Sequence, residues 1–354
     1  MQSILAPSFL PATVVIETTY KCNHLCLFCS CPWEAPNSKF SKNEELSIEE
    51  WKNILRVLTE KGILNIAFSG GEPLLKNGFD QLIEFASTLQ SKYIETVNNK
   101  LVERIAPPKI YVISNGGIMT EKYLDLFQKF DVHLSMSLPG LKTYNYHTQS
   151  GNPEKIIHWF VEAKKRNIST TVNITATKKN IGELYETISN ALIAGADNLL
   201  LNRFLPGGRG LKYRNELFMS VEQTNMMLEI AEEVLQKANR KGSVGTELPK
   251  CIIKKNNFTN LQIGSRCSAA IDFFTIDPSG FIRACNHSEN RIIHFSEYEK
   301  LKNNDLWRKF VMKDYKPEMC KSCKYQYVCD GGCREAANIC GGCINSIDPL
   351  FEKI

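Results

Sequence analysis

The chain has 354 residues, of which 43% are hydrophobic and 23% are charged, so it can bury a large core and form one large domain beside a smaller one. Its net charge of +5 is small for this length and the basic residues are scattered, which argues against a nucleic-acid-binding protein. No apolar run is long enough to cross a bilayer and residues 1–12 lack the features of a secretory signal, so we expect a cytoplasmic protein without a membrane partner.

Short β-rich runs alternate with amphipathic helical patterns from Thr13 to Arg203, which predicts a parallel sheet with crossover helices. The predicted strands are Thr13–Thr18, Asn65–Ser69, Lys109–Ser114, Asp131–Ser137, Ser169–Thr175 and Asn198–Arg203. The predicted helices between them include Ser47–Glu60, Thr120–Phe130, Pro153–Arg166 and Ile181–Ala194. The pattern predicts an α/β fold, a partial (β/α)6 TIM-like barrel, whose functional residues follow the C-terminal ends of the strands.

Three other segments divide the chain. Gln90–Pro108 is polar and is interpreted as a surface insertion, and a glycine-rich loop at Pro206–Gly210 precedes a predicted helix at Val221–Arg240. The cysteine density rises after residue 265, which indicates a second region organised by metal. We therefore predict an N-terminal extension (1–12), a core domain (13–215), a helical linker (216–264) and a cysteine-rich domain (265–354).

A first cysteine motif follows the first predicted strand. Cys22, Cys26 and Cys29 have the spacing C-x3-C-x2-C, and the thirteen cysteines of the chain lie in short spacings typical of metal-binding thiolates rather than of disulfides. A structural zinc site or an ordinary four-iron cluster takes four protein ligands, so three thiolates leave one metal position open for a small molecule. The alternative is a zinc knuckle, and Cys31 is interpreted as a bystander.

With Phe28 before its last cysteine, this motif closely resembles that of the radical S-adenosylmethionine (SAM) superfamily. The resemblance implies that Cys22, Cys26 and Cys29 hold a [4Fe-4S] cluster whose open iron binds the amine and carboxylate of SAM. It also implies that the reduced cluster cleaves SAM to a 5′-deoxyadenosyl radical. The sequence does not indicate a catalytic acid or base.

The next two strand ends also resemble cofactor-binding elements of this family. Gly70, Gly71 and Glu72 are similar to its G-G-E-P element, in which the glycines allow close approach and the glutamate contacts the methionine amine of SAM. Ser114 and Asn115 are similar to its T-N-G turn, and the alternative for both motifs is an ordinary turn.

The fourth and sixth strand ends match the family less closely. Ser135 and Ser137 resemble the region in which a serine contacts the methionine carboxylate or the ribose of SAM, although Pro139 replaces the usual acid or amide. The arginine that family members often carry shortly afterwards is absent from residues 144–151. Arg203 is the expected substitute, and the alternative for Arg203 is a residue that braces a loop.

A second cysteine series resembles the SPASM domain, which holds up to two auxiliary iron–sulfur clusters. The series is C-x12-G-x4-C followed by C-x2-C-x5-C-x3-C, made by Cys267, Cys285, Cys320, Cys323, Cys329 and Cys333. A zinc ribbon, the alternative, shares only the C-x2-C step.

The resemblance also implies how the auxiliary ligands divide. The first cluster is expected on Cys267, Cys285 and Cys333, with Cys251 as a fourth ligand or a buried thiol. The second cluster is expected on Cys320, Cys323, Cys329 and Cys343. Cys343 is preferred to Cys340 because two glycines precede it and can reverse the chain, and because Phe351 stands where the family commonly has its final cysteine.

Most SPASM enzymes modify peptides or proteins, so the resemblance implies a radical enzyme that matures a ribosomal peptide by crosslinking or epimerisation. Two alternatives remain: an enzyme acting on a small-molecule cofactor or tetrapyrrole precursor, and a non-catalytic metal-binding or electron-carrier protein. Asn286 stands where sulfatase maturases carry aspartate, which argues against that substrate. Expected partners are a flavodoxin or ferredoxin as electron donor and, since few residues precede the first strand, a separate leader-peptide-binding protein.

Overall fold

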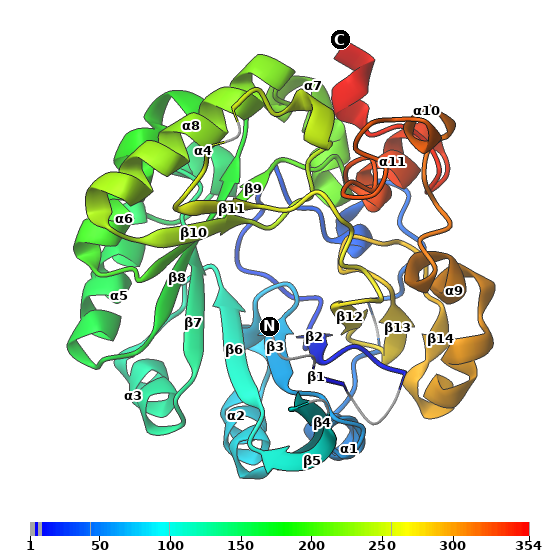
Figure 1. Ribbon diagram of the computed structural model, residues 1–354. Helices are drawn as coiled ribbons and strands as arrows, with labels where there is room; N and C mark the ends of the chain where they lie inside the picture. Colours follow the sequence, from blue (N-terminus) through cyan, green and yellow to red (C-terminus); the bar gives the residue numbers. More distant parts are fainter. Residues whose placement is uncertain (1–3, 6–8, 43, 99, 256, 354) are drawn as a thin grey trace.

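The computed structural model describes residues 4–5, 9–42, 44–98, 100–255 and 257–353. Within these residues, eleven strands form one sheet in the order β11-β10-β9-β8-β7-β6-β3-β2-β12-β13-β14. The sheet curves as an arc around the centre of the molecule, and most helices cover its outer side (Figure 1). The parallel strands are β2 (Thr13–Glu17), β3 (Asn65–Ser69), β6 (Lys109–Ser114), β7 (His133–Ser137), β8 (Thr170–Ala176), β9 (Asn198–Arg203), β10 (Lys241–Val244), β11 (Leu261–Ile263) and β12 (Phe273–Ile276).

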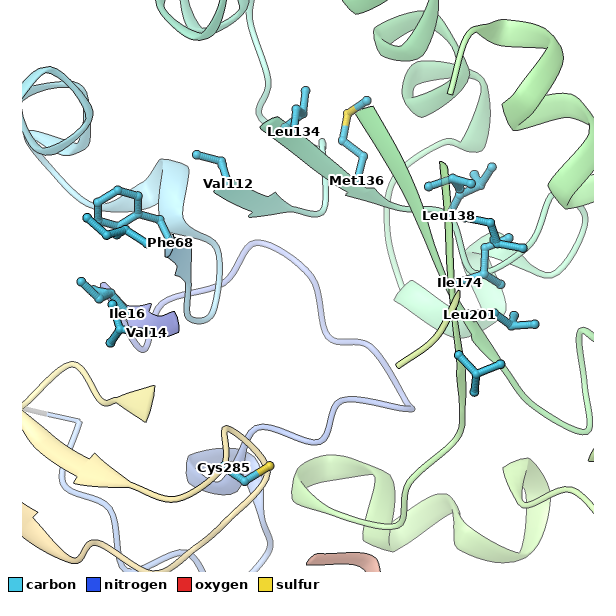
Figure 2. Close-up of a cluster of buried hydrophobic side chains, with 14 of the residues drawn as sticks. Val14, Ile16, Phe68, Val112, Leu134, Met136, Leu138, Ile174, Leu201 and Cys285 are labelled. Carbon is cyan, nitrogen blue, oxygen red and sulfur yellow. The ribbon is translucent and has the colours of Figure 1, made fainter. Parts of the chain in front are cut away.

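The predicted fold class is confirmed, because β2, β3, β6, β7, β8 and β9 occupy nearly the same residues as the predicted strands. Their side chains alternate between the two faces of the sheet, as in β8, where every second residue is buried. Figure 2 shows apolar side chains that successive strands contribute to the core, among them Val14 and Ile16 from β2, Phe68 from β3 and Val112 from β6. This layer holds the helices against the sheet.

The helices follow the predicted amphipathic pattern and have recognisable ends. Ser47 and Glu50 form a capping box at the start of α1, and Gly195 ends α6 in the left-handed conformation. The helices are α1 (Ile48–Glu60), α2 (Phe79–Thr88), α3 (Glu121–Lys129), α4 (Tyr144–Thr148), α5 (Pro153–Lys165), α6 (Leu184–Ala194), α7 (Arg214–Leu217), α8 (Val221–Ala238), α9 (Asp305–Val311), α10 (Glu318–Lys321) and α11 (Arg334–Gly341).

The segment 216–264 is not a linker, which corrects the prediction. Its helix α8 packs against α6, β10 pairs in parallel with β9, and β11 pairs in parallel with β10. The segment therefore continues the barrel. These two strands were missed because they have only four and three residues, too few to show a periodic pattern.

The cysteine-rich region also joins the barrel sheet. Its first strand β12 pairs in parallel with β2, from Phe273 opposite Thr13 to Ile276 opposite Ile16, and β13 (Phe281–Arg283) and β14 (Ile293–His294) follow antiparallel. A buried ion pair between Arg283 and Glu17 ties the same two parts together. The predicted domain boundary at residue 265 therefore falls between strands that belong to one continuous sheet.

The polar insertion at Gln90–Pro108 contains an antiparallel hairpin of β4 (Ser91–Val97) and β5 (Lys100–Ala106). The two residues of β1 (Ile4–Leu5) pair with β4, so part of the predicted extension 1–12 is attached to this hairpin, while residues 1–3 and 6–8 of it lie outside the described residues. In the described chain, every helix is too short or too polar to span a membrane.

Candidate active site

A cavity of about 360 Å³, which we call the large cavity, lies at the C-terminal ends of the parallel strands. It brings together residues from the loop after β2 and from the ends of β3, β6, β7 and β9, although these segments are far apart in the sequence. The predicted site residues that line it are Cys22, Cys26, Cys29, Gly70, Gly71, Ser114, Asn115, Ser137 and Arg203. The barrel topology therefore collects the predicted motifs at one place.

Backbone hydrogen bonds hold the cysteine loop against its neighbours. The N–H groups of Gly71 and Glu72 donate to the carbonyl oxygens of Thr19 and Lys21, both at 2.8 Å. A Cβ at Gly71 would lie 2.1 Å from the carbonyl oxygen of Lys21, so this close approach requires glycine. The G-G-E turn thus acts as a support for the start of the cysteine loop.

The glycine-rich loop after β9 packs on the other end of the cysteine loop. Gly210 N–H donates to the Cys29 carbonyl at 3.0 Å, and Gly208 has a positive φ of +48°. A Cβ at Gly208 would lie 2.4 Å from the carbonyl oxygen of Cys31. The side chain of Arg209 also donates to the Cys26 carbonyl at 3.3 Å, which places a cation beside the thiols.

The three thiols have different electrostatic surroundings. Burial raises the pKa of Cys22 to about 11 and raises the pKa of Cys26 well above its usual range. A hydrogen bond from the Cys31 thiol lowers the pKa of Cys29. Cys31 thus lines the cavity beside a predicted ligand. A cationic iron centre would favour all three thiolates, because a metal stabilises the charged form of a coordinating thiol.

Glu72 lies behind the cavity wall instead of facing the cavity, unlike the prediction. Its carboxylate is fully buried and accepts hydrogen bonds from Ser114 Oγ and Asn115 N, both at 2.8 Å, and from Leu74 N at 3.3 Å. Burial raises the pKa of Glu72 to about 7. Its observed role is to join the turn after β3 to the turn after β6.

The two serines of β7 differ in placement. Ser137 lines the cavity, whereas Ser135 is buried behind it, and its Oγ has no hydrogen-bond partner among the described residues. Asn115 connects the cavity wall to the cysteine loop, since its Nδ2 lies 2.9 Å from Asn23 Oδ1 and 3.7 Å from Cys22 Sγ.

Arg203 is a buried cation on the cavity wall. Its Nη2 pairs with Asp348 Oδ2 at 2.5 Å, and its Nε and Nη1 have no hydrogen-bond partner among the described residues. The side chain is therefore held by this ion pair and by a hydrogen bond from Nη2 to the Glu247 carbonyl at 3.5 Å, and it keeps two donors for a bound anionic group.

The auxiliary cysteines line two further cavities. Cys267, Cys285 and Cys333 share the first with Glu335, and this cavity shares Leu205, Gly245, Thr246, Asn286 and His287 with the large cavity. The second cavity is lined by Cys251, Cys320, Cys323 and Cys329, together with Phe351.

Two predicted auxiliary ligands lie elsewhere than expected. Cys251 faces the second cavity and not the first, because the short helix Lys250–Ile252 after β10 packs on the C-terminal cysteines. Cys343 is exposed beyond the end of α11, with its Sγ 3.2 Å from Ser346 Oγ, and does not line the second cavity. The two glycines turn the chain outward there.

The donor sets suit polynuclear clusters. No three His, Cys, Asp or Glu side chains in the described chain are gathered closely enough for one metal ion. Each group of thiols stands instead around the walls of a cavity, the arrangement that cysteine-ligated iron–sulfur clusters require.

Residues 16–191 match the family model of the Radical SAM superfamily. The chain belongs to this superfamily. The predicted membership is thereby confirmed, and the protein is a radical SAM enzyme, of a superfamily that uses a [4Fe-4S] cluster and SAM. Its C-terminal cysteine series resembles that of the SPASM domain and fits auxiliary clusters.

Similar proteins extend this relationship over the whole chain. The PqqA peptide cyclase of Bradyrhizobium diazoefficiens is 23% identical over 369 residues, which cover 98% of this radical SAM chain and 88% of the relative. The PqqA peptide cyclase of Granulibacter bethesdensis is 26% identical over 357 residues, which cover 96% of this chain and 86% of the relative. Streptococcus suis SuiB bound to SAM superimposes with a TM-score of 0.69 at 15% identity, covering 96% of this chain and 76% of SuiB. The enzyme anSMEcpe with bound SAM superimposes with a TM-score of 0.71 at 15% identity, covering 96% of this chain and 94% of anSMEcpe. These structures show the shared fold.

Several cavity residues of this radical SAM enzyme were not predicted. His24 lies inside the cysteine motif, and Asn202 precedes Arg203. Tyr144 begins the segment 144–151, which lacks the arginine that family members often carry. Asn286 and His287 come from the region of the auxiliary cysteines. Asn202 could have been predicted, because it lies at the C-terminal end of a predicted strand. Only the fold shows that the loop after Cys285 reaches this cavity.

Proposed function

We propose that this protein is a radical SAM/SPASM maturase that cleaves SAM and modifies a peptide or protein. The observation that carries the proposal is the large cavity, whose wall joins the C-x3-C-x2-C loop to Asn286 and His287 beside the auxiliary cysteine Cys285. A substrate bound there would contact both the SAM-binding motifs and the auxiliary region.

Cys22, Cys26 and Cys29 are assigned to hold the [4Fe-4S] cluster. When bound, this cluster supplies the electron that cleaves SAM to a 5′-deoxyadenosyl radical. The protein's own residues position the cofactor: Gly70 and Gly71 let the turn after β3 pack closely on the backbone of Thr19 and Lys21, which supports the cysteine loop. The two unpaired donors of Arg203 suit the methionine carboxylate.

The remaining polar groups of the wall complete the assigned SAM site. Ser114, Asn115 and Ser137 present hydroxyl and amide groups for the polar parts of SAM. Glu72 is assigned to hold Ser114 and Asn115 in place and not to contact SAM directly.

The relatives support a peptide as the substrate class. Two curated relatives are PqqA peptide cyclases, and similar solved structures include SuiB bound to its precursor peptide SuiA and anSMEcpe with a bound peptide. We assign a ribosomal precursor peptide as substrate and crosslinking or epimerisation as the reaction. A flavodoxin or ferredoxin is the proposed electron donor, and a separate leader-binding protein is a further proposed partner.

The test uses anaerobically reconstituted protein, SAM, a reductant and a precursor peptide encoded beside the gene. We expect 5′-deoxyadenosine together with a peptide that has lost a pair of hydrogen atoms or has taken up deuterium from heavy water. Production of 5′-deoxyadenosine with an unmodified peptide, and turnover of a small cofactor precursor instead, would overturn the peptide assignment. No 5′-deoxyadenosine under any condition would overturn the proposed reaction.

A further inference from the structure

The second auxiliary cavity contains four thiols but takes one of them from an unexpected part of the chain. Cys320, Cys323 and Cys329 come from the C-terminal series, and Cys251 comes from the segment after β10. We propose that Cys251 is the fourth protein ligand of the second auxiliary cluster, in place of a cysteine near the C-terminus. This proposal rests on the auxiliary-cluster part of the proposed function.

A backbone contact holds the segment of Cys251 at this cavity. The N–H of its neighbour Lys250 donates to Cys329 Sγ at 3.3 Å, across 79 residues of sequence. The side chain of Cys251 lines the cavity together with the thiols of Cys320, Cys323 and Cys329.

Other backbone donors also point at these sulfur atoms. Gly331 N–H donates to Cys329 Sγ at 3.3 Å and Tyr325 N–H to Cys323 Sγ at 3.5 Å. Amide donors of this kind stabilise thiolates and tune a bound cluster. A Cβ at Gly331 would lie 3.2 Å from Cys320 Sγ, so the backbone passes close to the site.

The C-terminal alternatives do not reach the cavity. Phe351 lines it but has no atom that could bind a metal, and Cys343 does not line it and contacts Ser346 instead. Cys340 is half-buried on α11 and does not line the cavity. Among the described cysteines, Cys251 is thus the one that adds a fourth thiol to this set.

The test uses a background in which Cys22, Cys26 and Cys29 are replaced by alanine, so that only auxiliary clusters contribute. In that background, Cys251→Ala should change the electron paramagnetic resonance spectrum of one auxiliary cluster and lower the bound iron and sulfide, by at most about half, because one of two clusters loses one of its four ligands. Cys343→Ala and Cys340→Ala are matched controls that should keep the background iron, sulfide and electron paramagnetic resonance spectrum.

A second substitution distinguishes the loss of a ligand from misfolding. Cys251→Ser keeps the side-chain size and offers oxygen, so it should retain the fold, measured by circular dichroism, and change the resonance signal of one cluster. Unchanged iron and spectra in both Cys251 variants, or loss of the cluster in Cys343→Ala, would overturn the proposal. SAM cleavage by the unmodified protein tests the proposed function separately, since it does not depend on Cys251 being a ligand.

A different observation concerns the first auxiliary cavity, which has three thiols. Glu335 lines it and is 2% exposed. Its Oε1 has no hydrogen-bond partner within 3.5 Å among the described residues, and its Oε2 accepts from Asn338 Nδ2 at 3.4 Å. The side chain of Ser288 also lies near this carboxylate. A buried carboxylate oxygen without a partner is costly unless a cation or donor meets it. We infer that Glu335 supplies the fourth, carboxylate ligand of the first auxiliary cluster.

The position of Glu335 supports this role. It lies in the first turn of α11, directly after the cluster cysteine Cys333, which caps the helix. One helix start thus brings a thiol and a carboxylate to the same cavity.

Glu335→Gln in the same triple-alanine background tests the inference, with Glu247→Gln as the matched control. Glu247 lines the same cavity, but its Oε1 is already used by Ser268 N–H at 3.3 Å. We expect Glu335→Gln to shift the resonance signal of one auxiliary cluster, whereas Glu247→Gln, which removes a charge from the same cavity but no ligand, should leave that signal unchanged. Identical spectra for Glu335→Gln and the background, with the fold retained, would overturn the inference.

Discussion

Arg203 and Asp348 form a buried ion pair that joins the end of β9 to the last residues of the chain, with Nη2 and Oδ2 2.5 Å apart. The same Oδ2 accepts the backbone N–H of the auxiliary cysteine Cys333 at 2.8 Å. One carboxylate therefore contacts both a cation of the large cavity and a residue of the first auxiliary cavity. The two sites are mechanically connected through it.

We expect Asp348→Asn to lower the free energy of unfolding by about 3–5 kcal/mol, because removing one partner leaves the buried Arg203 charge uncompensated. Urea denaturation of the anaerobically purified protein measures this. The control is Glu233→Gln, which breaks an exposed pair with Lys237 and should cost less than about 1 kcal/mol. Equal losses for both variants would contradict the role of the buried pair.

Replacing Cys22, Cys26 and Cys29 together by alanine should abolish 5′-deoxyadenosine formation but leave bound iron and sulfide, because the auxiliary thiols line other cavities. Product analysis by chromatography and colorimetric iron and sulfide assays measure the two effects. A variant that still forms 5′-deoxyadenosine at the original rate would refute the ligand assignment. An iron-free variant that binds zinc would refute the auxiliary clusters.

Gly71→Ala should weaken SAM binding by at least about tenfold, or about 1.4 kcal/mol, because the added Cβ meets the carbonyl of Lys21 and displaces the cysteine loop. Equilibrium dialysis of SAM against the reconstituted protein measures the affinity. Gly182→Ala is the control, since no described neighbour lies within 4 Å of the added Cβ. The expectation fails if the two variants bind SAM equally well.

Glu72 should make stability depend on pH. Burial raises its pKa from 4.5 to about 7 in the folded protein, so the folded state favours the neutral acid. Its contribution to the free energy of unfolding is fully present below about pH 4.5 and is lost as the pH rises through about 7. The total change is about 3 kcal/mol at most.

Glu72→Gln removes this titration. Unfolding free energies of the unmodified protein and the variant, measured from pH 4.5 to 7.5, should therefore differ by an amount that changes with pH, because the other titrating groups are common to both. Parallel curves would show that Glu72 has the same pKa in the folded and unfolded chain.

The sequence predicted those parts of the fold that have strong local signals. The strands β2, β3, β6, β7, β8 and β9 have regular apolar patterns. The cysteine, Gly70-Gly71 and Asn115 motifs follow β2, β3 and β6 directly, so they were expected together at the C-terminal edge of the sheet. The short strands β10 and β12 carried too few residues for such a pattern. They are specified by pairing with distant strands, which local periodicity does not report.

The auxiliary sites show the same limit. The family resemblance assigned Cys320, Cys323 and Cys329 to one cluster, and these three thiols line one cavity, whereas Cys333 of the same series lines the other. Cys251 was assigned to the other cavity because its position depends on the packing of the segment after β10. Glu335 carried no motif, and only its burial beside three thiols distinguishes it from other helix-start glutamates.

The pairing of β12 with β2 has a consequence for how the protein is made. The ribosome releases β2 among the first residues, but one edge of that strand stays open until Phe273 has emerged to pair with Thr13. An open strand edge is prone to associate with other chains, and pairings between distant residues form slowly. We therefore expect the growing chain to depend on protection by chaperones until its last quarter is synthesised, and a fragment ending before residue 265 to aggregate.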